Sequence, residues 1–280
     1  MPELPELEAF VIAQREALTA EPIESVPVAH FATTKTIDPP LQSLAGQRFT
    51  AVGRRAKRLL FTADGGDTMM VHLMSAGKLV VGGKRTKSSM LVVAFESGRD
   101  LIMSETGHKR RAGVWLLRPD ALAAELDHIG PEPLDPSYTV DVLAGSLKAR
   151  PHQLHAFLRD QRAIAGIGRA FANEILWAAM LSPYQRSAAL GDEDVAKLHA
   201  AITGTLGAAV ERLVPLSGSG LTTKADRGYA VHDRLAEPCA RCGDAIRRVS
   251  FDEHTVFYCP TCQTGGRVLA DRRLSRLLRE

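Results

Sequence analysis

The sequence predicts an α+β protein of two domains: an N-terminal β-sandwich that begins with a helix, and a C-terminal helical domain that carries a zinc-bound β-hairpin. Three observations support this prediction. Short apolar runs alternate with turn residues from about Phe49 to Leu117, apolar residues recur at spacings of three and four in the second half, and four cysteines lie close together near the C-terminus. Short apolar runs between turn signals indicate strands, whereas spacings of three and four indicate one face of a helix.

The N-terminal domain is predicted to span residues 1–130, and a short helix is expected over Leu7 to Leu18. Strands are expected over Met69–Leu73, Met90–Phe95 and Leu101–Met103. The dipeptide Ser97-Gly98 predicts a hairpin turn between the last two runs. A series of short strands separated by turns is typical of a β-sandwich or a barrel.

The second half begins with a proline-rich segment from Gly130 to Pro136, which cannot continue a helix or a central strand. We place the domain boundary there and predict a linker over residues 131–150. Helices are expected over Leu154–Leu158, over Ala170–Met180 and from Val195 to Leu213. The predicted helical domain spans residues 151–234, the cysteine unit residues 235–264, and a basic tail residues 265–280.

The four cysteines predict a structural zinc site. Two C-x2-C pairs, sixteen residues apart, consist of Cys239, Cys242, Cys259 and Cys262. Each pair can place two thiolates on one Zn²⁺, and four thiolates complete a tetrahedral site with no open coordination position. The residues between the pairs predict two strands around an exposed tip at Asp252-Glu253-His254, so the unit is expected to be a zinc-bound β-hairpin.

Composition and charge indicate a soluble, cytosolic protein with basic patches. Hydrophobic residues make up 45% and charged residues 24%, no apolar run approaches the ~20 residues of a membrane helix, and the acidic N-terminus does not resemble a signal peptide. The net charge is only +3, but basic residues cluster at Arg54–Arg58, Lys84–Lys87, His108–Arg111 and in the tail. Separate basic clusters on a nearly neutral chain favour a basic groove for nucleic acid, although any single cluster is more often a solvated face.

The N-terminus carries a candidate nucleophile. Removal of Met1 before the small residue Pro2 would leave a secondary α-amine, whose reference pKa of about 7.7–8.0 leaves more free base at neutral pH than a lysine has. The adjacent Glu3 and Glu6, one helical turn further on, could transfer protons around that amine. A Met-Pro-Glu start by itself also fits an ordinary first helical turn.

Five segments in order resemble the formamidopyrimidine-DNA glycosylase/endonuclease VIII family. They are Met1–Glu6, Gly53–Lys57, Gly130–Leu134, the stretch from Asp160 through Gly166-Ile167-Gly168 to Glu174, and the four-cysteine unit. The resemblance covers nearly the whole chain. It implies a bifunctional DNA glycosylase and abasic-site lyase of base excision repair, with a helix-two-turn-helix in the second domain and one structural Zn²⁺.

The resemblance also implies roles for individual residues. Pro2 would attack C1′ of a nucleotide extruded from double-stranded DNA that contains a damaged base or an abasic site, and the imine would drive β- or β,δ-elimination. Glu3 would act as general acid at the sugar ring oxygen, Glu6 would hold the geometry of the site, and Lys57 would bind the phosphates beside the lesion. Further DNA-binding candidates are Gly168, Arg169 and Glu174 at the turn, and His254 at the hairpin tip. Met74 or Ser75, together with Arg110, would fill the gap that the extruded nucleotide leaves in the duplex.

The chain departs from the family pattern at four places. His254 stands where an arginine is usual, and Arg169 replaces an asparagine. Ala112 replaces the phenylalanine of the loop that the family inserts beside the unpaired base. The stretch from Gly218 to Arg234 is short, which predicts an open lesion pocket and a preference for oxidised pyrimidines, ring-opened purines or abasic sites over 8-oxoguanine. Three alternatives remain: a damage-binding protein with weak chemistry, a zinc-finger DNA-binding regulator, and a structural zinc protein that acts on other proteins. A monomer is expected, because the architecture needs no partner.

Overall fold

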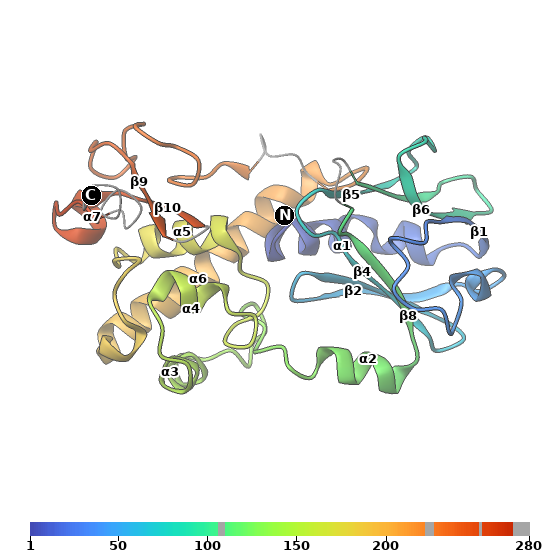
Figure 1. Cartoon of the computed structure of the whole chain (residues 1–280), viewed down its shortest axis with the longest axis horizontal. Helices are drawn as coiled ribbons and strands as arrows, with labels where there is room; N and C mark the ends of the chain where they lie inside the picture. The colour runs from blue at the N-terminus through green and yellow to red at the C-terminus, as the bar shows by residue number, and fades with distance from the viewer. Residues whose placement is uncertain (106–109, 222–226, 252–253, 271–280) are drawn as a thin grey trace, which may run out of the picture. The chain divides into compact units, whose positions relative to one another are not determined.

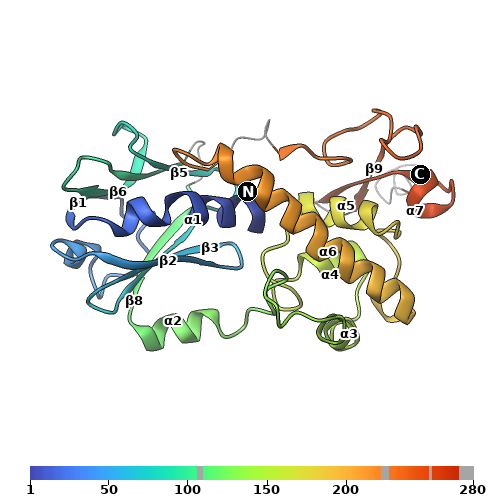
Figure 2. The ribbon, with the colours of Figure 1, turned by 180° about the vertical axis from the view of Figure 1, so that it is seen from behind.

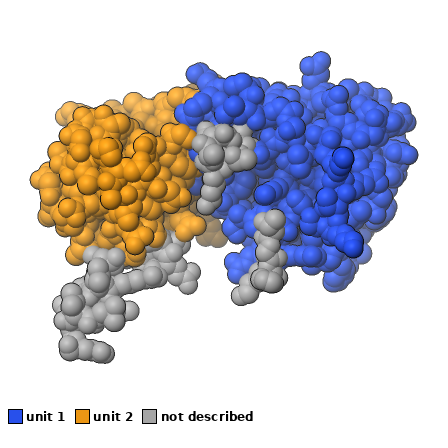
Figure 3. Space-filling model, turned by 90° about the horizontal axis from the view of Figure 1, so that it is seen from above, with its two compact units in different colours: residues 1–128, 209–227 blue, residues 129–208, 228–280 orange. Residues whose placement is uncertain are grey.

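The computed structural model describes residues 1–105, 110–221, 227–251 and 254–270. The chain forms two compact units, shown in Figure 3. Unit 1 comprises residues 1–128 and 209–227, and unit 2 comprises residues 129–208 and 228–280. Unit 1 therefore contains an early and a late segment of the chain.

Helix α1 (Leu4–Thr19) opens unit 1, three residues before the predicted start. Glu3 is its N-cap and forms a capping box with Glu6, and Pro5 lies in the first turn, where a missing backbone N–H removes no helical hydrogen bond. Its apolar side chains Leu4, Leu7, Phe10, Val11 and Leu18 are buried. These features begin and anchor the helix at the very start of the chain.

Two four-stranded sheets form the body of unit 1. The first has the order β1-β6-β7-β5, and the second has the order β2-β3-β4-β8; every neighbouring pair of strands is antiparallel. The strands are β1 (Ile23–Ala29), β2 (Phe49–Arg55), β3 (Arg58–Ala63), β4 (Thr68–His72), β5 (Gly77–Val81), β6 (Ser89–Phe95), β7 (Leu101–Glu105) and β8 (Gly113–Leu117). A single apolar core contains side chains of both sheets and of α1, which lies between the sheets in Figures 1 and 2. The predicted β-sandwich with its N-terminal helix is confirmed.

Unit 1 also contains η1 (Leu41–Leu44), α2 (Pro119–Leu126) and η3 (Val214–Leu216). The late segment is tied to the early one by hydrogen bonds. The side-chain amide of Gln14 donates to the Ser217 carbonyl at 2.8 Å, and the Val81 N–H donates to the Ser219 carbonyl at 2.9 Å. These contacts bring residues near 220 to the edge of β5 and the side of α1.

Unit 2 is helical and ends in the cysteine unit, as predicted. Its elements are α3 (Val140–Ala149), α4 (Leu154–Arg159), α5 (Arg169–Ala178), η2 (Ser187–Ala189), most of α6 (Asp192–Leu213), β9 (Arg247–Phe251), β10 (His254–Tyr258) and α7 (Pro260–Thr264). The three helices expected from apolar spacing correspond to α4, α5 and α6. None of the helices in the described ranges is both long and apolar enough to cross a membrane.

Three α-helices were not predicted from the sequence: α2, α3 and α7, a five-residue helix inside the cysteine unit. Helix α2 is only eight residues long and buries none of them, so its apolar spacing is limited to Leu122 and Leu126. Helix α3 buries only Leu143 and Leu147 and begins at the N-cap Thr139, whose hydroxyl accepts a hydrogen bond from the Val142 N–H. Helix α3 lies within residues 131–150, the stretch that the prolines led us to predict as a linker.

Candidate active site and zinc centre

The N-terminus of α1 brings together three of the predicted catalytic residues. Pro2 is buried and directly precedes the N-cap. Glu3 and Glu6 are 4% and 1% exposed, and the Glu3 backbone N–H donates to Glu6 Oε2 at 2.9 Å. The Glu3 side chain in turn accepts a hydrogen bond from the third residue of the helix. Both carboxylates are thus held beside Pro2 by reciprocal hydrogen bonds at the positive end of the helix.

Arg227 forms a buried ion pair with Glu6. Its Nε lies 2.9 Å from Glu6 Oε1, and its side chain is 13% exposed. Burial raises the pKa of Glu6 to about 6, Arg227 opposes this increase, and the nearby charge of Glu3 adds to it. Glu6 is therefore mainly ionised at neutral pH and becomes protonated in mildly acidic solution.

Lys57 lies in the two-residue turn between β2 and β3. Arg55 pairs with Arg58 across the hairpin, and Ala56 has a φ of +51°, which is uncommon for a residue with a side chain. Arg54 stabilises this turn, because its Nη1 donates to the Ala56 carbonyl at 2.9 Å and its Nε binds Glu8 Oε2 of α1 at 2.9 Å. The turn that carries Lys57 is thereby fixed to the helix that carries Glu3 and Glu6.

His72, at the end of β4, was not identified from the sequence. Burial, together with the nearby positive charges of Arg58 and Lys57, lowers its pKa to about 4. His72 is therefore neutral at physiological pH, and its Nδ1 accepts a hydrogen bond from the Met74 N–H at 3.3 Å. A neutral imidazole beside a lysine and an arginine suits a binding site for an anion such as phosphate.

The turn after β4 presents the two candidates for the gap left by an extruded nucleotide. Met74 has a φ of +49° and is 37% exposed, and Ser75 is also exposed. The Gly77 N–H donates to the Leu73 carbonyl at 2.9 Å, and a Cβ at position 77 would lie only 2.4 Å from that oxygen. Glycine is thus required at position 77 for this tight turn.

Arg110 and Ala112 follow residues 106–109, which lie outside the described ranges. The buried carboxylate of Glu105 accepts the N–H of Arg111 at 2.9 Å and that of Ala112 at 3.0 Å. Arg110 is exposed, and its Nη1 lies 3.0 Å from His30 Nε2. Ala112 is fully buried in the apolar core, so Glu105 fixes a backbone that points Ala112 inward and leaves Arg110 at the surface.

In unit 2 the glycine turn between α4 and α5 is organised by Gln161. Its Oε1 accepts the Gly166 N–H at 2.9 Å, and its Nε2 donates to the Ile167 carbonyl at 2.8 Å. Gly166 has a φ of +81°, and Gly168 is the N-cap of α5. Arg169, the first residue of α5, is exposed. A helix N-terminus with an exposed arginine favours an anion.

Glu174 of α5 fixes the segment before the first cysteine pair. Its carboxylate, 7% exposed, accepts the backbone N–H groups of Ala230, Val231 and His232 at 2.6, 3.0 and 2.8 Å. Burial raises the pKa of Glu174, and these hydrogen bonds oppose the increase. Glu174 therefore connects the glycine turn's helix to the chain that leads into the zinc unit.

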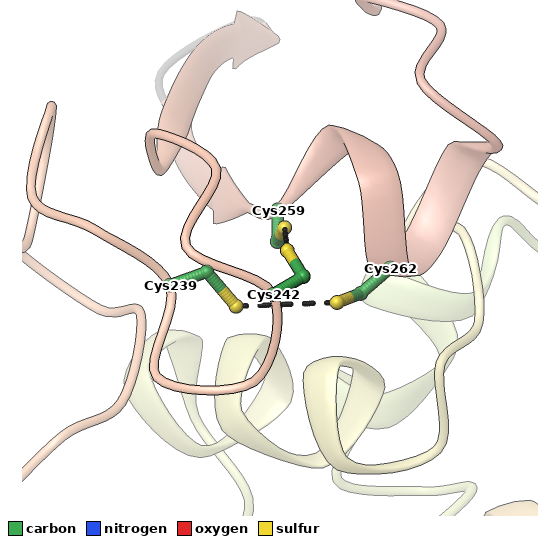
Figure 4. Close-up of side chains that lie close together, drawn as sticks. All are labelled: Cys239, Cys242, Cys259 and Cys262. Atoms are coloured by element: carbon green, nitrogen blue, oxygen red, sulfur yellow. Dashed lines mark hydrogen bonds between the residues drawn. The ribbon is translucent and has the colours of Figure 1, made fainter.

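The four cysteines converge on one point, as Figure 4 shows. Their sulfur atoms all lie within 4.8 Å of one another, with Cys239 Sγ 3.9 Å from Cys262 Sγ and Cys242 Sγ 3.4 Å from Cys259 Sγ. Four converging thiolates fit one tetrahedral Zn²⁺. The cysteine unit is a structural zinc site, as predicted.

The surroundings of the zinc site support its ligands. Trp177 Nε1 donates to Cys239 Sγ at 3.3 Å, and the Arg241 guanidinium lies 4.3 Å above the indole ring. Strands β9 and β10 form the predicted hairpin, and His254 pairs with Phe251 as the first residue of β10. The tip residues 252–253 lie outside the described ranges. Beyond α7, the Leu269 N–H donates to the Tyr258 hydroxyl at 2.9 Å, so the start of the tail contacts the hairpin.

Comparisons with known proteins identify the same architecture. Three family models match in order: the formamidopyrimidine-DNA glycosylase N-terminal domain at residues 1–115, the formamidopyrimidine-DNA glycosylase H2TH domain at residues 129–221, and a zinc finger found in FPG and IleRS at residues 236–265. The formamidopyrimidine-DNA glycosylase of Chloroflexus aurantiacus is 36% identical, and the match covers 94% of this chain and 98% of that protein. A formamidopyrimidine-DNA glycosylase-like protein of Mycobacterium tuberculosis is 43% identical over 54% of this chain and 94% of its own length.

Solved structures are similar over the same range. MutM (Fpg) from Thermus thermophilus has a TM-score of 0.80 at 28% identity, with coverage of 94% of this chain and 98% of that one. The complex of Lactococcus lactis Fpg with abasic-site DNA has a TM-score of 0.84 at 24% identity, with coverage of 94% and 99%, and supports the fold.

The fold, the buried carboxylates beside Pro2 and the four-thiolate zinc site define a two-domain DNA glycosylase of base excision repair. The chain belongs to the formamidopyrimidine-DNA glycosylase family, for which abasic-site lyase activity is typical. Membership of this family excludes two of the three alternative classes: the zinc-finger DNA-binding regulator and the structural zinc protein that acts on other proteins.

Proposed function

We propose that this glycosylase uses the amine of Pro2, exposed by removal of Met1, as its nucleophile. The observation that supports this proposal is the arrangement at the start of α1, where Pro2 is followed by two buried, hydrogen-bonded carboxylates. The amine attacks C1′ of the damaged nucleotide and the base leaves; the C1′–O4′ bond then breaks, O4′ takes up a proton, and an iminium ion forms between the proline nitrogen and C1′. Loss of a proton from C2′ then breaks the bond to the 3′ phosphate and nicks the strand by β-elimination.

Each neighbour of Pro2 has a separate role in this proposal. Glu3 protonates the sugar ring oxygen as the ring opens, and Glu6 holds the Glu3 backbone through its hydrogen bond to that N–H. Lys57 binds phosphate beside the lesion, next to the neutral His72. Met74 or Ser75 and Arg110 occupy the gap left by the extruded nucleotide, which their exposure allows.

Unit 2 contributes phosphate contacts. Gly168 and Arg169 offer backbone N–H groups and a cation at the start of α5, and Glu174 supports this helix and the segment after it. His254 stands where the family has an arginine, and because an imidazole cannot form a bidentate fork it binds phosphate more weakly than that arginine would. Duplex DNA with a damaged base or an abasic site is the substrate.

The preferred lesions are oxidised pyrimidines, ring-opened purines and abasic sites. The stretch from Gly218 to Arg234 is too short for a long loop over an oxidised purine. Related structures hold several lesions: Lactococcus lactis Fpg binds DNA with an abasic site and DNA with an oxidised pyrimidine, and a MutM complex holds carbocyclic 8-oxo-G. Turnover of 8-oxoguanine opposite cytosine as fast as that of dihydrothymine would contradict this preference. We further propose a monomer that acts on the chromosome in the cytoplasm.

Borohydride trapping tests the chemistry. A duplex with one abasic site is incubated with wild type, Pro2→Gly or Lys57→Met in the presence of borohydride, and the covalent complex is digested with trypsin. Wild type and Lys57→Met should carry the DNA on the N-terminal peptide, residues 2–15. Pro2→Gly keeps a primary α-amine and should carry any trapped DNA on the same peptide, whereas trapping on a lysine-containing peptide would contradict the proposal. Tight abasic-site binding by wild type without a trapped complex would favour the damage-binding alternative.

A further inference from the structure

A segment of unit 1 that has no assigned function carries an exposed aromatic side chain, Phe31, next in sequence to His30, which contacts Arg110. Residues His30 to Ile37 follow β1 and run along the beginning of β8. The Val114 N–H donates to the Thr33 carbonyl at 2.9 Å, and the Lys35 N–H donates to the Val114 carbonyl at 2.8 Å. The segment begins with a tight turn, in which the Thr33 N–H donates to the His30 carbonyl at 2.9 Å. Its backbone is thus fixed to the strand that follows Arg110 and Ala112.

Phe31 lies in this turn and is 88% exposed. Among the large apolar side chains exposed in the described ranges, it is the only aromatic one. Folding gains nothing from an aromatic ring left in water, so the ring of Phe31 is free to contact another molecule.

The charges around Phe31 indicate what that contact is. The neighbouring His30 Nε2 lies 3.0 Å from Arg110 Nη1, and the side chains of Lys35, Arg110 and Arg111 are exposed. An aromatic ring among exposed cations is the arrangement with which proteins stack on nucleobases while binding the phosphates. This concentration of positive charge matches the phosphates of a nucleic acid better than it matches the surface of a second protein molecule.

Base extrusion supplies the need for such a ring. A glycosylase that acts on an extruded nucleotide leaves its neighbours in the duplex partly unstacked, and apolar side chains commonly fill such gaps. Ala112 cannot do so, because it is fully buried in the core. Thr33 and Lys35 fix the segment of Phe31 to β8, the strand that follows Ala112, and His30 connects its turn to Arg110.

We propose that Phe31 stacks on a base of the bound duplex at the lesion, with Arg110 beside it, and so stabilises the complex in which the nucleotide is extruded. Phe31 is a positioning residue and takes no part in bond making. The inference rests on the proposed extrusion of the nucleotide, but the imine chemistry can be measured without it, because a single-stranded abasic oligonucleotide needs no extrusion.

Three variants test this inference: Phe31→Ala, Phe31→Trp, and the control Ile37→Ala, which removes an 84% exposed side chain from the same segment. The probe is a duplex with a tetrahydrofuran abasic analogue and 2-aminopurine in the opposite strand. Because stacking on an aromatic contributes ~1–3 kcal/mol per base, Phe31→Ala should weaken binding of this duplex about 5- to 150-fold. Undamaged duplex should bind within about twofold of wild type, and 2-aminopurine should be brighter in the variant complex because its stacking partner is lost. Ile37→Ala should resemble wild type.

Phe31→Trp provides an independent signal, since stacking on a base should quench the new indole when the abasic duplex binds. Borohydride trapping on the single-stranded abasic oligonucleotide should be equal for wild type and Phe31→Ala, so that a failure of the imine chemistry is seen separately. The inference is overturned if Phe31→Ala binds the abasic duplex as wild type does, or if Ile37→Ala weakens it equally. It is also overturned if Phe31→Ala changes only the oligomeric state measured by light scattering.

Discussion

Replacement of Arg227 by methionine tests the electrostatics beside the proposed nucleophile. The substitution keeps an apolar chain of similar reach but removes the guanidinium 2.9 Å from Glu6. Burial raises the pKa of Glu6 to about 6, and Arg227 is the largest influence that lowers it. An adjacent opposite charge lowers the pKa of a carboxyl by about 1–3 pH units, so Glu6 in Arg227→Met should titrate above neutral pH and be protonated at pH 7.

The change has a defined sign and size. The pKa of Glu6 is raised from an unfolded value of 4.5, so the folded protein binds the proton more tightly than the unfolded chain does. The stability that this group contributes is complete below pH 4.5 and is lost as the pH rises through the folded pKa. In Arg227→Met that loss continues to higher pH, and at about 1.4 kcal/mol per pH unit the variant should be about 1.4–4 kcal/mol less stable than wild type at pH 9. Near pH 4.5, where Glu6 is protonated in both proteins, this difference should disappear.

Urea unfolding at pH 4.5 and pH 9, followed by tryptophan fluorescence, measures the difference. The matched control is Arg212→Met, which removes a cation that donates to the Arg227 carbonyl at 2.6 Å but leaves the Arg227 side chain in place. The rate of borohydride trapping should fall at acidic pH as Glu6 becomes protonated. In Arg227→Met this fall should occur at a higher pH, because Glu6 ionises at higher pH. Two results would refute the assignment of Arg227 as the charge that keeps Glu6 ionised. One is an equal loss of stability at both pH values, and the other is a trapping rate that falls at the same acidic pH in Arg227→Met as in wild type.

Two further predictions concern unit 2. Glu174→Ala removes the acceptor of three backbone N–H groups at residues 230–232, and since an unsatisfied buried donor costs ~1–3 kcal/mol, we expect a loss of about 3 kcal/mol or more in the free energy of unfolding. Glu174→Gln, which keeps one acceptor oxygen, should lose less in the same urea titration; equal losses would contradict the hydrogen-bond explanation. Trp177→Phe removes the indole N–H that donates to Cys239 Sγ, and zinc should pass to a chromogenic chelator about tenfold faster than from wild type. The control Trp115→Phe should release zinc at the wild-type rate, and no acceleration in Trp177→Phe would show that this hydrogen bond does not stabilise the site.

Several features of the molecule could be predicted from the sequence because each is a local pattern. The spacing of the two C-x2-C pairs predicted the zinc site, and sixteen intervening residues are enough for the hairpin that brings the pairs together. Apolar residues from Val195 to Leu213 predicted a helix, because their spacing repeats with every turn. The start of α1 was predicted too late, since its first turn depends on a capping box that apolar spacing does not reveal. Helix α2 is eight residues long and buries none of them, which is too short a stretch for a clear apolar repeat.

The features that decide the chemistry involve residues far apart in the chain. The sequence identified Pro2, Glu3, Glu6 and Lys57 as candidates through the family resemblance, and their roles remain proposals. It did not indicate that Arg227 neutralises Glu6 or that His72 lies beside Lys57. Phe31 carried no signal either, because its importance depends on exposure and on the contact between His30 and Arg110.

The sequence by itself therefore determined the N-terminal helix, the helices α4, α5 and α6, which cysteines bind zinc and which family the chain resembles. Only the tertiary structure decided the protonation of Glu6 and His72 and the neighbours of Arg110. A spacing of two to four residues is read along one element, whereas a pKa depends on burial and on charges brought in from other elements. Residues 6 and 227 meet only because the late segment folds back onto α1 and β5, and no local pattern records that contact.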